Sequence, residues 1–181
     1  MLFPHTETDR VALRPAGPQD APEAYRILFE LGAAGLPVLD AFVKNFGEGL
    51  SACFLVHDKG TDEVVGLSTV SCATSAGHAR IEVHLAGPAA AELAGDVHAL
   101  TVNFAFAMWR LRKVYVHRTS PDAAELGLGT ATADLVRAEA VLPDHTYFHG
   151  RLWDVHILAV HRDDWNTHGV PLLKQIGCLR R

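Results

Sequence analysis

The chain has 181 residues, of which 49% are hydrophobic and 20% are charged, and its formal net charge is -5 at pH 7. This length and apolar content predict a single domain over residues 1–181 with a sizeable buried core, and the negative charge argues against binding to nucleic acid. No window approaches the ~20 apolar residues of a membrane span and no basic leader precedes an apolar run, so we expect a cytoplasmic protein outside the membrane.

The first half of the chain shows strand and helix signals in turn. A strand is expected at 8–15, followed by a helix that begins near Pro18 and stops at Gly32, and by a second short helix after Pro37. Two apolar strand candidates, 51–57 and 63–72, are joined by the turn-rich residues 58–62, which predicts a hairpin.

The second half alternates strands with one long helix. Residues 79–86 alternate as a half-buried strand would, residues 96–111 follow a helical period, and residues 113–118 form a further strand candidate. The helix is apolar nearly all round, which predicts a buried central helix. A closing hairpin is expected to pair residues 138–149 with 151–161. Antiparallel strands followed by strands separated by helices predict an α/β (α+β) fold with a mixed sheet.

Three segments together resemble the GNAT family of acyltransferases, of the RimJ/RimL-like kind that acetylates ribosomal-protein N-termini. They are residues 8–15 with Asp20, residues 96–118 and residues 150–165. The resemblance covers nearly the whole chain and implies a mostly antiparallel sheet of about six to seven strands with helices on both faces. It also implies N-acyl transfer from acetyl-CoA, another acyl-CoA or a carrier-bound pantetheine thioester to an amine of a small molecule or peptide. An acyl carrier protein and a second copy of the chain are the other candidate partners.

The resemblance also implies a binding site for the acyl-CoA donor. Its pantetheine arm would run beside His84 and the residues after it, and its pyrophosphate would meet backbone amides at the turn before the long helix. The implied donor contacts are Leu85, Ala86, Gly87, Leu93, Ala94, Gly95, Asp96 and Val97. In the family this turn carries an Arg or Gln followed by two glycines, whereas Glu92 and Ala94 stand at the glycine positions here. A carboxylate beside a pyrophosphate repels it unless the side chain points away or a cation intervenes.

A second glycine-containing segment, residues 126–131, also resembles a phosphate-binding loop. Using it as such leaves too little chain for the remaining helix and strands, so we expect Gly127 and Gly129 to loosen a helix or to end it early.

Candidate catalytic residues lie on two neighbouring strands. An amine that attacks a thioester near neutral pH must first lose a proton, and a carboxylate or imidazole is suited to accept it. Glu82 and His84 are two residues apart on one strand and therefore face the same side, as do Tyr115 and His117 on the next strand. Glu82 is the expected base, His84 an alternate base or orienting group, and Tyr115 the acid that protonates the leaving thiolate. The alternative is polar alternation on a solvent-facing sheet.

Other chemical signals are weaker. Five of the 11 histidines lie between residues 145 and 168, but their spacing does not match a metal site, so no metal is expected. Cys53, Cys72 and Cys178 show no metal-ligand or redox spacing, which fits buried cysteines in a reducing compartment. A basic patch after the long helix either complements the helix dipole or contacts an anionic donor; it comprises Arg110, Arg112, Lys113 and Arg118.

Two further functions stay open at the level of sequence because the phosphate-loop glycines are missing. One is a GNAT-like protein that binds a metabolite or partner without transferring an acyl group. The other is an enzyme that uses the same cleft for a different reaction in a biosynthetic pathway, with histidines as acid and base.

Overall fold

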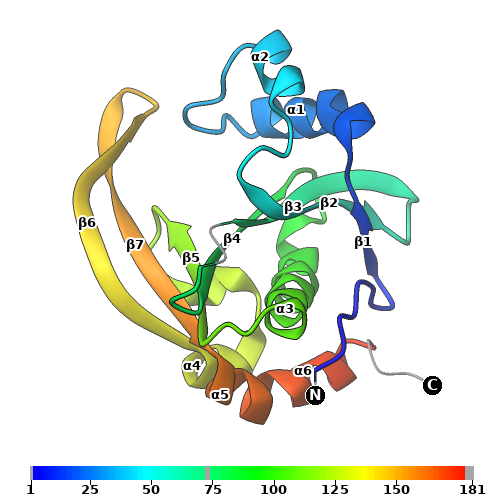
Figure 1. Ribbon diagram of the computed structural model, residues 1–181, viewed down its shortest axis with the longest axis vertical. Coiled ribbons are helices and arrows are strands. Elements are labelled where there is room, and N and C mark those ends of the chain that lie inside the picture. Colours follow the sequence, from blue (N-terminus) through cyan, green and yellow to red (C-terminus); the bar gives the residue numbers. More distant parts are fainter. Residues whose placement is uncertain (1, 72–73, 178–181) are drawn as a thin grey trace.

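The computed structural model describes residues 2–71 and 74–177, and within them seven strands form one sheet in the order β1-β2-β3-β4-β5-β7-β6 (Figure 1). Neighbouring strands are antiparallel except β4 and β5, which are parallel. The predicted mixed, mostly antiparallel sheet is therefore confirmed. The strands are β1 (Val11–Pro15), β2 (Leu50–Asp58), β3 (Glu63–Ser71), β4 (His78–Leu85), β5 (Lys113–Arg118), β6 (Val136–Phe148) and β7 (Arg151–His161).

Helices cover both faces of the sheet, as predicted. The long helix α3 packs on one face, and α1 with α2 packs on the other (Figure 1). No helix in the described ranges is long and apolar enough to cross a bilayer. The α-helices are α1 (Ala21–Glu30), α2 (Leu39–Lys44), α3 (Ala90–Met108), α4 (Thr132–Leu135), α5 (Arg162–Asp164) and α6 (Val170–Gln175). Short 3-10 turns lie at Pro18–Asp20, Ala123–Leu126 and Gly129–Ala131, and a π-helical turn, Trp165–Gly169, joins α5 to α6.

The main core lies between α3 and the sheet. Alternate residues of β4, β5 and β7 point toward α3, and Ile81, Val116 and Leu158 are at most 5% exposed. Trp165 is fully buried in the same cluster. Full burial of such a side chain contributes about 1.5–3 kcal/mol, so this layer fixes the position of β4 and β5 from behind. The opposite face of these two strands carries their polar residues.

Helix α3 begins at Ala90, six residues before the predicted start at Asp96, and ends at Met108 rather than Leu111. The predicted start of the helix is therefore wrong, and residues 93–95, expected in the turn before it, belong to α3. Alanine has the highest helix propensity of all residues, so the alanine-rich segment after Pro88 joins the helix. Gly95 lies inside α3, and the loop that carries Gly127 packs against it. A Cβ at Gly95 would lie 2.1 Å from the backbone oxygen of Gly127, which means that only glycine fits this contact.

Gly127 ends the 3-10 turn at Ala123–Leu126 in the left-handed conformation, with φ 72°. This confirms the prediction that a glycine ends a helical segment early here. Since Gly127 also contacts Gly95, the close approach of two glycine backbones joins this turn to the first half of α3.

An ion pair between the half-exposed Arg10 and the buried Asp96 joins the N-terminal segment to α3. The Asp96 side chain is 1% exposed and accepts hydrogen bonds from Thr8 Oγ1 at 2.8 Å and from Arg10 Nε at 3.1 Å, with a second Arg10 nitrogen at 2.5 Å. Hydrogen bonding to Asp96 is the main cause that raises the pKa of Arg10, and the charge of Glu92 adds to it. Glu92 lies one helical turn before Asp96. The acidic residue near the start of α3 is thus accompanied by a cation.

Candidate active site

The parallel strands β4 and β5 separate half-way along their length. Their pairing runs from His78 and Lys113 to Ile81 and Val116 and ends there. The following residues of β4, 82–85, remain paired with β3 alone. The two strands therefore diverge beyond these residues, and Glu82 lies at the point where they separate.

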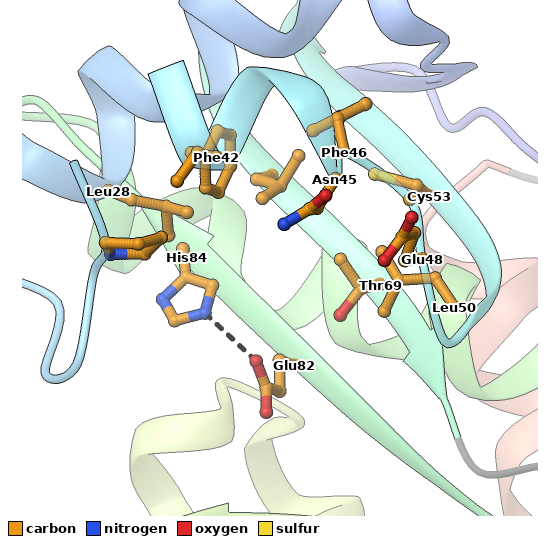
Figure 2. A pocket seen from close by; sticks show the side chains of 14 residues that line it. Leu28, Phe42, Asn45, Phe46, Glu48, Leu50, Cys53, Thr69, Glu82 and His84 are labelled. Atoms are coloured by element: carbon orange, nitrogen blue, oxygen red, sulfur yellow. Dashed lines mark ion pairs between the residues drawn. The ribbon is translucent and has the colours of Figure 1, made fainter. Parts of the chain in front are cut away.

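Glu82 is the centre of a charged cluster on the sheet face opposite α3. Its carboxylate lies 2.7 Å from Arg80 Nη2 and 3.5 Å from His84 Nε2, and Figure 2 shows the contact with His84. The hydrogen bond with His84 lowers the pKa of Glu82, and the positive charge of Arg80 contributes, while burial acts in the opposite direction. Glu82 therefore stays a carboxylate at neutral pH and is well suited to attract an ammonium group.

His117 lies across the divergence from Glu82, on β5. Burial and the positive charge of Arg80 lower the pKa of His117 below its ordinary value of 6.5, with His145 acting in the same direction and Glu82 against it. The imidazole is consequently neutral at pH 7 and can accept a proton. Three of the four predicted catalytic residues, Glu82, His84 and His117, thus come together.

The hydroxyl of Tyr115 points elsewhere. It donates a hydrogen bond to Glu139 Oε2 on β6 at 3.2 Å, and Glu139 also contacts Lys113 Nζ at 2.6 Å and His161 Nε2 at 3.0 Å. The ring of Tyr115 contacts His117 with 6.4 Å between the ring centres. Tyr115 therefore supports the position of His117, while its role as an acid stays a prediction.

A pocket of about 310 Å³ lies between α1 and α2 and the face of the sheet that carries Glu82 (Figure 2). Cys53, Thr69 and Glu82 are cross-strand neighbours on β2, β3 and β4 and lie side by side in its lining. Its further lining residues are Leu28, Pro37, Ala41, Phe42, Asn45, Phe46, Gly47, Glu48, Leu50, Leu67 and His84.

The contribution of α2 to this pocket was missed from the sequence. Phe42 and Phe46 lie four residues apart, with Asn45 between them, and this spacing after Pro37 is the signal that predicts one apolar helix face. The sequence does not say which surface that face covers.

Cys53 is not suited to act as a nucleophile in this pocket. Burial raises the pKa of its thiol to about 11, so the reactive thiolate is scarce at neutral pH. An acyl group is therefore better transferred directly to an amine than through Cys53. Cys72 and Cys178, the other two cysteines of the sequence, lie outside the described residues.

The predicted donor contacts fall into two groups. Leu85 is the last residue of β4, in the part that is not paired with β5, and Ala86 and Gly87 follow it. Gly87 has φ 86°, and a Cβ there would meet no atom within 4 Å, so its backbone is accessible. Residues 93–97 instead lie inside α3, where the Leu93 amide already donates to the Ala89 oxygen at 3.1 Å. The side chains of Leu93, Asp96 and Val97 are buried. Pyrophosphate binding by residues 93–97 stays a prediction. The amides without a hydrogen-bond partner inside a helix are those of its first turn, which in α3 precedes most of these residues.

The predicted basic patch divides between the two ends of β5. Arg118 stands at the carboxyl end of the strand, which parallel pairing places on the same side as the start of α3, and it forms an ion pair with Glu125. The other members lie before or at the beginning of β5. There Arg112 Nη2 donates to the Ala76 oxygen at 2.9 Å, and Lys113 contacts Glu139. Arg118 is thus the member of the patch placed to approach an anionic donor.

The histidines of the closing hairpin are spread over different surfaces. His156 and His161 lie opposite Arg118 and Lys113 of β5, five residues apart, and so face opposite sides of the sheet. Within residues 2–71 and 74–177, no three His, Cys, Asp or Glu side chains are grouped so that they could hold a metal ion.

Comparison with known proteins gives a clear answer for the fold. No family model matches the chain, and no curated protein matches its sequence. Solved structures do match. A chimera of the spermidine N-acetyltransferase SpeG from Vibrio cholerae and hSSAT has a TM-score of 0.73 and 16% identity, with 88% of this chain and 99% of that chain covered. Vibrio cholerae spermidine N-acetyltransferase in complex with CoA and spermine gives a TM-score of 0.66 at 16% identity, with 87% and 98% covered.

The chain has the GNAT fold. Identities of 15–16% establish this fold alone, and they do not single out the RimJ/RimL-like branch to which the sequence motifs are similar. Within this fold, the separation of β4 and β5 and the pocket both lie at Glu82.

Proposed function

We propose that the protein is an N-acyltransferase that moves an acyl group from acyl-CoA to the amine of a small molecule. The observation that carries the proposal is the cluster of Glu82, His84 and His117 at the point where β4 and β5 separate, next to a pocket of about 310 Å³. The complex of a structural neighbour with CoA and spermine supports it, since that protein has the same fold.

Glu82 and His117 have different roles toward the acceptor amine. The Glu82 carboxylate attracts the ammonium form and orients it, while His117, whose pKa is lowered, accepts a proton directly or through a water molecule. The free amine then attacks the thioester carbonyl, so that a C–N bond forms and the C–S bond breaks. As the intermediate collapses, the nitrogen loses a second proton and the sulfur gains one, so the net products are the amide, the free thiol of CoA and the proton held by His117. Tyr115 stays the proposed acid for the departing sulfur, a role that requires its hydroxyl to leave Glu139.

The donor would lie along the part of β4 that is not paired with β5. Backbone groups of residues 85–87 would contact the pantetheine arm, and the first-turn amides of α3 would contact the pyrophosphate. The attraction between Arg10 and Glu92 reduces the repulsion that Glu92 would otherwise exert on the phosphates.

Calorimetric titration with acetyl-CoA tests the donor. We expect saturable binding of about micromolar strength, and its absence at millimolar concentration would overturn the proposal. Carrier-bound acetyl-pantetheine, titrated in parallel, shows whether a carrier protein improves binding. Binding without transfer to any amine would favour a protein that holds a metabolite.

The variant Glu82→Gln tests the site. We expect kcat/KM for the amine to fall by about 10²-fold, since the amide keeps the shape and loses the charge. Glu23→Gln is the matched control because Glu23 forms an exposed ion pair with Arg26 on the outside of α1. Equal kcat/KM for Glu82→Gln and the wild type at all pH values would eliminate the assigned role of Glu82.

A further inference from the structure

We infer that the acceptor is a compact primary amine with an apolar body, such as an arylalkylamine or a branched alkylamine, rather than a polyamine or a peptide. The inference rests on the proposed function and concerns the pocket beside Glu82. The walls, the charges and the size of this pocket support it.

The wall formed by α2 and the residues just after it is apolar, and contacts between its own aromatic rings hold it in place. Phe42 and Phe46 line the pocket, and their ring centres are 5.7 Å apart. The ring of Tyr25 on α1 contacts Phe42 edge-on at 5.4 Å, which fixes Phe42 from behind. Leu67 on β3, 4% exposed, and Leu28 on α1, 8% exposed, also line the pocket. An apolar group between these side chains loses contact with water on two sides.

The charges of the pocket suit one ammonium group. Its acidic lining residues within the described chain are Glu82 and Glu48. Glu82 already faces Arg80 and His84, and Glu48 is exposed to solvent. The remaining polar lining residues, Asn45, Cys53 and Thr69, carry no charge at neutral pH. A second ammonium group could pair only with the solvent-exposed Glu48, and exposed pairs contribute little. An ammonium group placed along the apolar wall would lose water without gaining a carboxylate, which is costly.

The size of the pocket suits a single ring or a short branched chain. Its volume of about 310 Å³ is at the lower end of the range for small-molecule sites, which is about 300–1,000 Å³. Glu82 and His84 form part of one wall, so the amine of the acceptor can reach them while its body contacts Phe42 and Phe46 (Figure 2).

The experiment compares 2-phenylethylamine with spermidine as acceptors in an acetyl-CoA transfer assay. We expect kcat/KM to be at least tenfold higher for 2-phenylethylamine, a difference of about 1.4 kcal/mol. Ala41→Glu places a carboxylate in the pocket lining and should reduce this preference about tenfold. Val38→Glu is its matched control, since Val38 is 73% exposed and does not line the pocket, so it should leave the preference unchanged.

Glu48→Gln separates the two kinds of acceptor. We expect the variant to keep or widen the preference for 2-phenylethylamine over spermidine, because it removes the second carboxylate of the pocket lining. A preference for spermidine that falls tenfold or more in Glu48→Gln would overturn the inference, and so would equal use of both amines.

Amine binding measured calorimetrically without CoA distinguishes a failure of the proposed function from a failure of the inference about the acceptor. If acetyl-CoA does not bind while 2-phenylethylamine binds more tightly than spermidine, the proposed function is wrong and the assignment of the pocket stands. If acetyl-CoA binds and 2-phenylethylamine is neither bound nor acetylated in preference to spermidine, the inference about the acceptor is wrong.

Discussion

Replacing Gly95 by alanine tests the contact that positions the start of α3. The added Cβ would lie 2.1 Å from the Gly127 oxygen, whereas real Cβ atoms essentially never come within 3.0 Å of such an atom, so the helix or the loop must move by about 0.9 Å. The obstructing atom belongs to the backbone and cannot rotate away. Overpacking of this kind costs about 1–3 kcal/mol, and we take the upper end. Alanine regains about 1 kcal/mol through its better helix propensity, which leaves a net loss of about 2 kcal/mol.

Urea and thermal unfolding measure this loss. At about 2–4 °C per kcal/mol for a chain of this length, Gly95→Ala should lower the Tm by about 4–8 °C. Gly60→Ala is the control, since its added Cβ would meet a flexible Asp58 side-chain oxygen at 3.2 Å, and we expect a change within about 0.5 kcal/mol. Gly127→Ala should lose more stability than Gly95→Ala, because its φ of 72° adds about 1–2 kcal/mol of backbone strain. A Gly95→Ala protein as stable as the wild type would refute the reasoning about this contact.

Three further predictions follow from the ionisable groups. Because the pKa of His117 is lowered, kcat/KM should fall as the pH drops through that pKa and the imidazole gains a proton; His117→Gln should lose this acidic limb, and an unchanged profile would contradict the role of His117 as the base. Cys53, whose thiol has a pKa of about 11, should react with iodoacetamide at pH 7.5 far more slowly than a free thiol with a pKa near 8.5, and mass spectrometry of the modified peptide measures the rate. Arg10→Met leaves Asp96 buried and should destabilise the fold by about 2–4 kcal/mol in urea unfolding, whereas Arg26→Met, in an exposed pair, should change stability by at most about 1 kcal/mol. Equal losses of stability in these two variants would show that the ion pair of Arg10 with Asp96 is not the cause of the loss in Arg10→Met.

Short-range patterns in the sequence were sufficient to predict where the strands lie and which of their side chains share a face. Alternation in residues 79–86 and 113–118 predicted β4 and β5 within one residue, and the two-residue spacing of Glu82 and His84 placed them on one face. These features depend on the period of a strand, which every neighbouring pair of residues expresses. The segments similar to the GNAT family added the mostly antiparallel sheet of about six to seven strands with helices on both faces, whereas the strand order came from the structure.

The tertiary structure alone decided where α3 begins, what Gly95 does and which residues line the pocket. The sequence places Gly95 at the turn before the helix, yet its contact with Gly127, 32 residues later, makes glycine the residue that α3 requires there. Phe42 on α2 and Thr69 on β3 line the same pocket although 27 residues separate them. Likewise the neutral state of His117 depends on burial and on Arg80 from another strand. Such contacts join residues far apart in the chain, and a local pattern cannot record which distant surface a side chain will meet.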